Sequence, residues 1–260
     1  MIRQLKITVT SILLLLVSLS SSAFELNVEF SADAVQVSPG QPPLTSKMYV
    51  SKFAVRTEMN QHGNRIVDIA YPKKGKRLLL YPEKKMYLEK TGLAVSSSWA
   101  GKAPKTPCEG IKNIRCKKLG KEKINKLKVD KWQIERTVNG KIFKSLHWID
   151  SKRHFAIKEM FPDGGMLELE LIGKETLNGR EVEQWVSRYT HPSGRNRLSR
   201  QWYDPQLKMV IKEELPGGFL RELTNIKVSK QSNNLFKLPK GYRKLDGKMN
   251  TLNTSTRVKR

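Results

Sequence analysis

Arg65-Ile-Val-Asp-Ile-Ala-Tyr71 is followed by Arg77-Leu-Leu-Leu-Tyr81 and Lys85-Met-Tyr-Leu-Glu89 in this chain of 260 residues. Each segment is short, apolar on alternate or successive positions, and bounded by Gly, Pro or Asn. This pattern is typical of antiparallel strands joined by tight turns. A further strand or strand pair is predicted over Lys47–Met59. The N-terminal half therefore predicts a β-meander.

The second half contains an internal repeat. Gly120-Lys-Glu-Lys-Ile-Asn125 matches Gly173-Lys-Glu-Thr-Leu-Asn178 at an offset of 53 residues, and after a one-residue slip the match resumes at an offset of 54. Each unit contains turns, alternating strands and one Trp-x-Asp element. We therefore predict two repeated β-meander units, about 119–170 and 172–228, within one continuous sheet.

Four tryptophans occupy equivalent positions in the two units. They are Trp132, Trp148, Trp185 and Trp202. Large aromatic residues at such positions pack in a core or line a ligand cleft. We keep these four as candidates for lining a ligand site, with core packing as the other interpretation. Asp150 and Asp204, which end the Trp-x-Asp elements, are expected to start turns and to cap backbone donors.

The N-terminus predicts export. A short basic segment precedes an apolar run over residues 7–19, and small residues lead up to Ala23. We expect a signal peptide over residues 1–23, cleaved after Ala23, and a mature protein in the periplasm. A retained anchor is the alternative, although the run is short for a membrane span of about 20 residues. Residues 24–245 then form a single domain, and residues 246–260 a disordered basic tail.

The chain is strongly basic, with 49 Lys and Arg against 24 Asp and Glu, and a formal net charge of +25. Cleavage would remove only the charges of Arg3 and Lys6. Such a balance favours an anionic partner, and export directs this expectation to the anionic envelope surface and away from nucleic acid. The candidate surface residues are Lys73, Lys74, Lys76, Arg77, Lys117 and Lys118, with solvated strand edges and turns as the alternative.

The two cysteines, Cys108 and Cys116, predict a structural disulfide in an exported chain. The four His lack a third ligand in the pattern, so we expect no metal site. No Gly-x-Ser-x-Gly elbow and no Gly-rich phosphate loop occurs, and Ser145 and Ser199 fall inside predicted strands. We therefore expect no cofactor and no enzymatic activity.

Several motifs together carry a family resemblance that spans about residues 24–245. They are Phe30-Ser-Ala-Asp-Ala-Val, Lys47-Met-Tyr-Val, Arg56-Thr-Glu-Met, Leu79-Leu-Tyr-Pro-Glu-Lys-Lys-Met-Tyr-Leu-Glu89 and Phe236-Lys-Leu-Pro-Lys-Gly-Tyr242, together with the Gly-Lys-Glu and Trp-x-Asp repeats. In these features the chain resembles a branch of the LolA/LolB-like superfamily of bacterial periplasmic proteins, the outer-membrane lipoprotein-sorting type.

The resemblance implies a mainly β fold, a strongly curved antiparallel sheet that forms an unclosed barrel, with a few short helices at its concave face. In the lipoprotein carriers this hollow holds acyl chains, and a related regulatory branch binds an anti-sigma factor. We therefore expect binding of a lipid or lipid-like ligand, an acyl chain or an anionic glycolipid, with a role in lipoprotein or lipid trafficking. The alternative is a regulatory module that docks a membrane-protein partner. Unlike the carriers, the chain offers only residues 91–107 as a candidate lid.

Overall fold

The computed structural model describes residues 28–61, 63–91, 106–108, 111 and 113–245. The expected signal peptide and basic tail, and most of the candidate lid, lie outside these residues. Three short 3-10 helices occur among them, η1 (Pro72–Lys74), η2 (Pro82–Lys84) and η4 (Asn233–Phe236), and no α-helix does. The described chain is therefore almost entirely strands and turns.

The strands of the N-terminal half are β1 (Phe30–Val37), β2 (Leu44–Val50), β3 (Val55–Gln61), β4 (Asn64–Tyr71), β5 (Lys76–Tyr81) and β6 (Met86–Lys90). Those of the C-terminal half are β7 (Ile114–Ile124), β8 (Leu127–Val138), β9 (Lys141–Asp150), β10 (Ala156–Met160), β11 (Met166–Leu177), β12 (Arg180–Thr190), β13 (Asn196–Asp204), β14 (Met209–Leu215), β15 (Phe219–Val228) and β16 (Arg243–Lys244).

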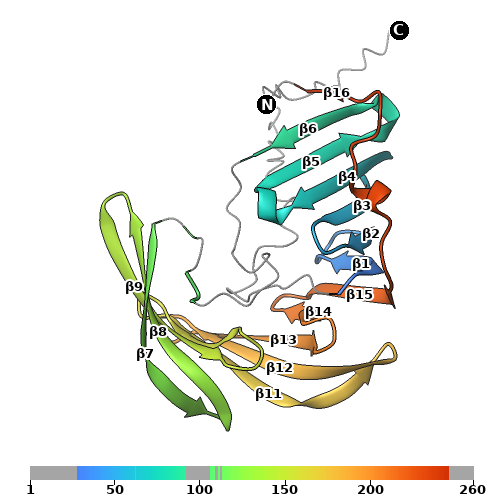
Figure 1. The fold of residues 1–260 in the computed structure, drawn as a ribbon. Helices are drawn as coiled ribbons and strands as arrows, with labels where there is room; N and C mark the ends of the chain where they lie inside the picture. The colour runs from blue at the N-terminus through green and yellow to red at the C-terminus, as the bar shows by residue number, and fades with distance from the viewer. Residues whose placement is uncertain (1–27, 62, 92–105, 109–110, 112, 246–260) are drawn as a thin grey trace, which may run out of the picture.

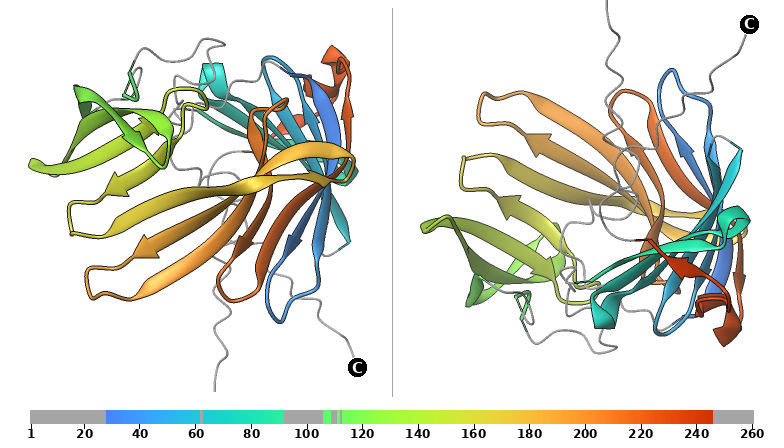
Figure 2. Two further views of the ribbon diagram at one scale, coloured as in Figure 1. Left: turned by 90° about the horizontal axis from the view of Figure 1, so that it is seen from below. Right: turned by 90° about the horizontal axis from the view of Figure 1, so that it is seen from above.

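All these strands belong to one sheet, in the order β16-β6-β5-β4-β3-β2-β1-β15-β14-β13-β12-β11-β10-β9-β8-β7. The sheet is strongly curved and does not close on itself (Figures 1 and 2). Neighbouring strands are antiparallel, except that β16 pairs with β6 in parallel. The predicted mainly β fold, a strongly curved and unclosed antiparallel sheet, is thus confirmed.

The two halves of the sheet are joined by β1 and β15. β1 pairs with β2 on one side and with β15 on the other, and in the second pairing Ala34 lies opposite Leu223. A side-chain contact supports this long-range pairing: Asn225 donates a hydrogen bond of 2.8 Å to Asp33, 192 residues away in the chain. The N-terminal meander and the C-terminal hairpins therefore form one continuous surface.

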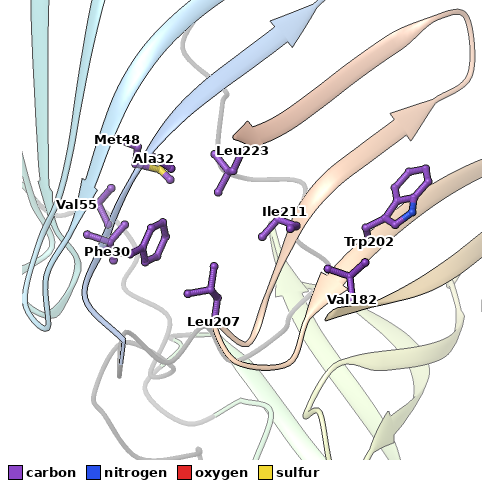
Figure 3. Close-up of a cluster of buried hydrophobic side chains, with 10 residues drawn as sticks. Phe30, Ala32, Met48, Val55, Val182, Trp202, Leu207, Ile211 and Leu223 are labelled. Carbon is purple, nitrogen blue, oxygen red and sulfur yellow. The ribbon is translucent and has the colours of Figure 1, made fainter. Parts of the chain in front are cut away.

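A buried apolar cluster lies at this junction. Phe30 and Met48 come from the first two strands, and Ile211 and Leu223 from β14 and β15. Figure 3 shows these side chains, with Leu207, Trp202 and Val182, gathered from both halves. Phe30 is only 1% exposed. Because side chains of both halves surround the Phe30 ring, the pairing of β1 with β15 also buries apolar surface, which stabilises both halves.

The segment that follows β15 covers the outer side of the N-terminal strands, as both views of the ribbon show (Figures 1 and 2). Phe236 of η4 is 1% exposed and packs with Val67, Ile69, Leu78 and Leu80. Arg56 donates a hydrogen bond of 2.7 Å to the carbonyl of Leu235, and the Tyr71 hydroxyl donates to the carbonyl of Phe236. The convex face of this half is therefore covered.

Substitution of Phe30 tests the junction. Phe30→Ala removes a fully buried ring from the contact between the halves, and we expect it to lower the free energy of unfolding by about 3–5 kcal/mol. Phe219→Ala is the matched control, because Phe219 is 45% exposed, and we expect a change within about 1 kcal/mol. Urea denaturation followed by tryptophan fluorescence measures both. Equal losses in the two variants would contradict this account of the junction.

Candidate functional site

The concave side of strands β3–β6 carries half-exposed apolar side chains. Successive residues of a strand point to opposite faces. Leu78 and Leu80 pack with Phe236 of the C-terminal segment, so Leu79 lies on the opposite, concave face. The cross-strand partners Leu79 and Leu88 share this face, as do Met59 and Ile66. We call the half-exposed residues of this face the inner wall: Met59, Ile66, Leu79, Tyr81 and Leu88.

An ion pair is embedded in the inner wall. The Arg77 guanidinium donates hydrogen bonds of 2.7 and 2.9 Å from Nε to the two carboxylate oxygens of Asp68, and Nη2 also donates to this carboxylate. Asp68 is the cross-strand partner of Leu79 and is 6% exposed. The hydrogen bond with Asp68 raises the pKa of Arg77. The guanidinium charge is therefore compensated within the wall.

The other basic candidates are spread over the sheet. Lys76 lies 2.6 Å from a Glu89 carboxylate oxygen, and Lys118 lies 2.8 Å from one of Asp130. Lys73 and Lys74 of η1 are exposed, and so is Lys117 of β7. Lys73, Lys74 and Lys76 lie in or beside β5, whereas Lys117 and Lys118 lie on β7. The two strands belong to opposite ends of the strand order. A single docking face made of all six stays a prediction.

The four candidate tryptophans are all buried. Trp132, Trp148 and Trp202 are 8%, 5% and 6% exposed, and Trp185 has no exposed surface. Trp148 and Trp185 belong to one apolar cluster with Tyr203, and Trp202 belongs to the junction cluster. In the structure these four side chains are therefore part of the core. Their contact with a ligand stays a prediction.

Residues that the sequence aligns between the two units make matching contacts. The indole nitrogen of Trp148 donates a hydrogen bond of 2.8 Å to Glu122, and that of Trp202 donates to Glu175. The ammonium of Lys158 lies 5.6 Å from the Trp148 ring centroid, and that of Lys212 lies 4.4 Å from the Trp202 ring centroid. The duplication itself stays a prediction, but its aligned residues hold each indole between a carboxylate and a cation.

The Asp of each Trp-x-Asp element organises the turn that follows it. Asp150 accepts hydrogen bonds from the backbone amides of Lys152 and Arg153. Asp204 accepts the same pair of bonds from the two corresponding amides, those of Gln206 and Leu207. Both carboxylates are nearly fully buried. The expected capping role of these two residues is therefore present in the structure.

Cys108 and Cys116 form a disulfide, as the sequence predicts. The bond ties β7 to the residues that precede it. Because β7 is the last strand of the sheet order, this link restrains a strand that has only one neighbour. A disulfide of this kind stabilises a fold by restricting the unfolded chain.

The inner wall was not identified from the sequence. Its signal is the run Leu78-Leu79-Leu80, because three successive apolar residues in a strand place apolar side chains on both faces. On one face, these side chains pack against the C-terminal segment, which lies about 150 residues further along the chain. On the other face, Leu79 and Leu88 are half-exposed in the part of the chain that the structure describes. Only the tertiary structure distinguishes the two.

Among the described residues, no group of three or more His, Cys, Asp or Glu side chains is arranged to hold a metal ion. A helix with the length and apolar character of a membrane span is also absent from this part of the chain.

No family model and no curated protein sequence matches the chain. Similar solved structures include a LolA superfamily protein from Nitrosomonas europaea, with 11% identity, a TM-score of 0.38 and coverage of 84% of this chain and 97% of that one. A proposed outer membrane lipoprotein-sorting protein domain from Vibrio parahaemolyticus has 12% identity, a TM-score of 0.36 and coverage of 82% and 90%. The MucA/MucB complex of Pseudomonas aeruginosa has 10% identity, a TM-score of 0.21 and coverage of 82% and 97%. The solved structures that the chain is similar to therefore include a LolA superfamily protein, at low identity, and this likeness identifies no ligand.

Tyr203 provides a test of the tryptophan-rich cluster. It is 7% exposed, and its ring centroid lies 5.5 Å from that of Phe155. Burial raises the pKa of Tyr203 to about 12, and the nearby Glu183 carboxylate adds to this rise. Because the pKa is raised on folding, the stability contributed by the neutral phenol is complete below about pH 10 and is lost as the pH rises towards 12.

Alkaline titration of the native protein at 295 nm measures this pKa. We expect one phenol to ionise near pH 12 and to disappear from the titration in Tyr203→Phe. Between about pH 10 and 12, the wild-type protein should lose more free energy of unfolding than Tyr203→Phe does. A Tyr203 phenol that ionises near pH 10 in the folded protein would contradict the packing of this cluster.

Proposed function

We propose that this chain is an exported periplasmic protein that binds a lipid or lipid-like ligand on the concave face of its sheet. The observation that supports this most directly is the inner wall. It presents half-exposed apolar side chains from four neighbouring strands, Met59, Ile66, Leu79, Tyr81 and Leu88. An acyl chain is the ligand that such a strip of aliphatic and aromatic surface suits best, because apolar contact with it is non-directional.

The surroundings of the inner wall support the same proposal. The wall continues into the junction cluster, because Met48, Thr57 and Asp68 follow one another as cross-strand partners on this face. The same face of the sheet therefore runs from the inner wall to the buried apolar residues of β14 and β15, with Thr57 and the Asp68–Arg77 pair between them. The excess of Lys and Arg suits a ligand with phosphate or carboxylate groups at one end. Transport of a lipid or lipoprotein between envelope sites would follow from such binding.

A second candidate function is docking of a membrane-protein partner, and β7 favours it. This eleven-residue strand lies at one end of the strand order and carries Arg115, Lys117, Lys118, Lys121 and Lys123. An edge strand can pair with an extended segment of another protein, and here that segment would be acidic. Lysines on an edge also protect it from unwanted pairing, so this candidate ranks below lipid binding.

Extraction of the purified protein tests the main proposal. We expect lipid to be recovered in organic solvent and identified by mass spectrometry, and we expect saturable binding of a fluorescent fatty acid to the delipidated protein. Absence of both would contradict the proposal. Recovery of a single crosslinked protein partner without lipid would favour the docking function instead.

A substitution in the inner wall locates the binding. Leu79→Asn replaces an apolar contact with a neutral amide, and we expect the fatty-acid affinity to fall about tenfold, which corresponds to about 1.4 kcal/mol. Leu119→Asn on β7 is the matched control, because Leu119 is 44% exposed and lies on the strand at the far end of the sheet order. Titration of the fluorescent probe measures both, with thermal unfolding as a check on folding. Equal affinities of the two variants would place the ligand elsewhere.

A further inference from the structure

Three polar side chains of β9 and β10 form an array that the sequence analysis did not identify. Ser145 and His147 are two positions apart in β9, so their side chains share a face. Glu159 of β10 is the cross-strand partner of His147. The Ser145 Oγ lies 2.8 Å from His147 Nε2, and His147 Nδ1 lies 3.3 Å from Glu159 Oε1. A hydroxyl, an imidazole and a carboxylate therefore follow one another in line.

The burial of this array needs an explanation. His147 and Glu159 are 8% and 5% exposed. Within the described part of the chain, His147 Nδ1 and Glu159 Oε1 have no hydrogen-bond partner of good geometry, although they face each other. Burial of such groups without full hydrogen bonding costs stability. Ser145 is only half-buried, and its hydroxyl also lies 3.4 Å from the carbonyl oxygen of Ile134.

The other repeat unit offers an internal comparison. In the sequence alignment of the units, Ser145, His147 and Glu159 match Ser199, Gln201 and Glu213. The amide of Gln201 cannot accept a proton near neutral pH, so the second unit lacks a base at this position. Its carboxylate, Glu213, has a different partner, because Arg221 lies 3.6 Å from it. The imidazole is therefore specific to the first unit.

We propose that Ser145, His147 and Glu159 form a nucleophilic site that cleaves carboxylic esters. A nucleophile in hydrogen-bond contact with a base, which is itself oriented by a third group, is the arrangement that activates a serine. Ser145 is the nucleophile and His147 the base, and Glu159, whose Oε1 lies 3.3 Å from Nδ1, is a positioning residue whose negative charge favours the Nδ1–H tautomer of the imidazole. This inference is independent of the lipid-binding proposal.

The reaction balances with water as the only other reactant. The Ser145 Oγ forms a bond to the acyl carbon of the ester, and its hydroxyl proton moves to His147 Nε2. The bond between the acyl carbon and the alcohol oxygen breaks, and the alcohol leaves with that proton. Water then attacks the acyl-serine by the same route, which releases the carboxylic acid and restores Ser145.

The neighbours of Ser145 indicate which ester fits. Ile134 is its cross-strand partner, and Phe143, 43% exposed, precedes it on the same face of β9. These residues offer an apolar contact for the acyl group. Arg136 is the cross-strand partner of Phe143 and so is a diagonal neighbour of Ser145. A long side chain can reach across such a diagonal, so Arg136 is the cation that the proposal assigns to the negative charge that forms on the carbonyl oxygen.

A fluorophosphonate probe tests the nucleophile directly. We incubate the full chain with the probe, locate the adduct by peptide mass spectrometry, and follow hydrolysis of p-nitrophenyl butyrate. We expect an adduct on Ser145, its loss in Ser145→Ala, and no change in the control Ser199→Ala. Absence of an adduct on Ser145 in the folded wild-type protein would overturn the proposal, as would labelling of Ser199 in its place.

Two further variants test the roles of the base and the positioning residue. His147→Gln, which copies the second unit, should lower the labelling rate at least about 100-fold. Glu159→Gln should also lower it, and Glu159→Asp should restore part of the rate because a carboxylate is retained. Thermal unfolding of each variant shows whether it still folds. Ser145→Ala changes only Ser145, the half-buried residue of the three. An unchanged labelling rate in folded His147→Gln would overturn the proposal.

Discussion

Pairing between β1 and β15 is the interaction on which this architecture depends. Without it, the N-terminal meander and the C-terminal hairpins would be two separate sheets, each with a further exposed edge. The pairing joins residues almost two hundred positions apart, so its formation costs loop-closure entropy. Burial of Phe30, Met48 and Leu223 at the same place offsets this cost. The sheet therefore becomes continuous at the same step in which the apolar cluster at the junction is buried.

The curvature and the C-terminal segment together give the N-terminal strands two different faces. On the convex side, Phe236 and its neighbours complete an ordinary apolar core. On the concave side, the same strands present Leu79 and Leu88 half-exposed, around the compensated pair of Asp68 and Arg77. A sheet has two faces, and among the described residues the C-terminal segment packs against the convex one, so the proposed ligand is assigned to the concave one. This asymmetry is the physical basis of the proposed function.

Local features of this protein could be predicted from its sequence. Alternation and turn residues predicted the strands, and the spacing of Cys108 and Cys116 predicted their bond. The capping role of Asp150 and Asp204 followed from the chemistry of a carboxylate at the start of a turn. These predictions succeeded because each depends on residues close together in the chain. The pairing of the surface candidate Arg77 with Asp68 could not be predicted in this way, because the two residues meet only through the register of neighbouring strands.

Backbone geometry and composition are enough to predict the strands, their alternating faces, the turns and the excess of positive charge. The order of the strands, the covered face of β5 and the position of Glu159 opposite His147 emerge only in the folded chain. They do so because strand pairing is set by the burial of side chains from distant segments and by register. A shift of one residue would turn Ser145 and His147 to the other face, and no local pattern excludes it.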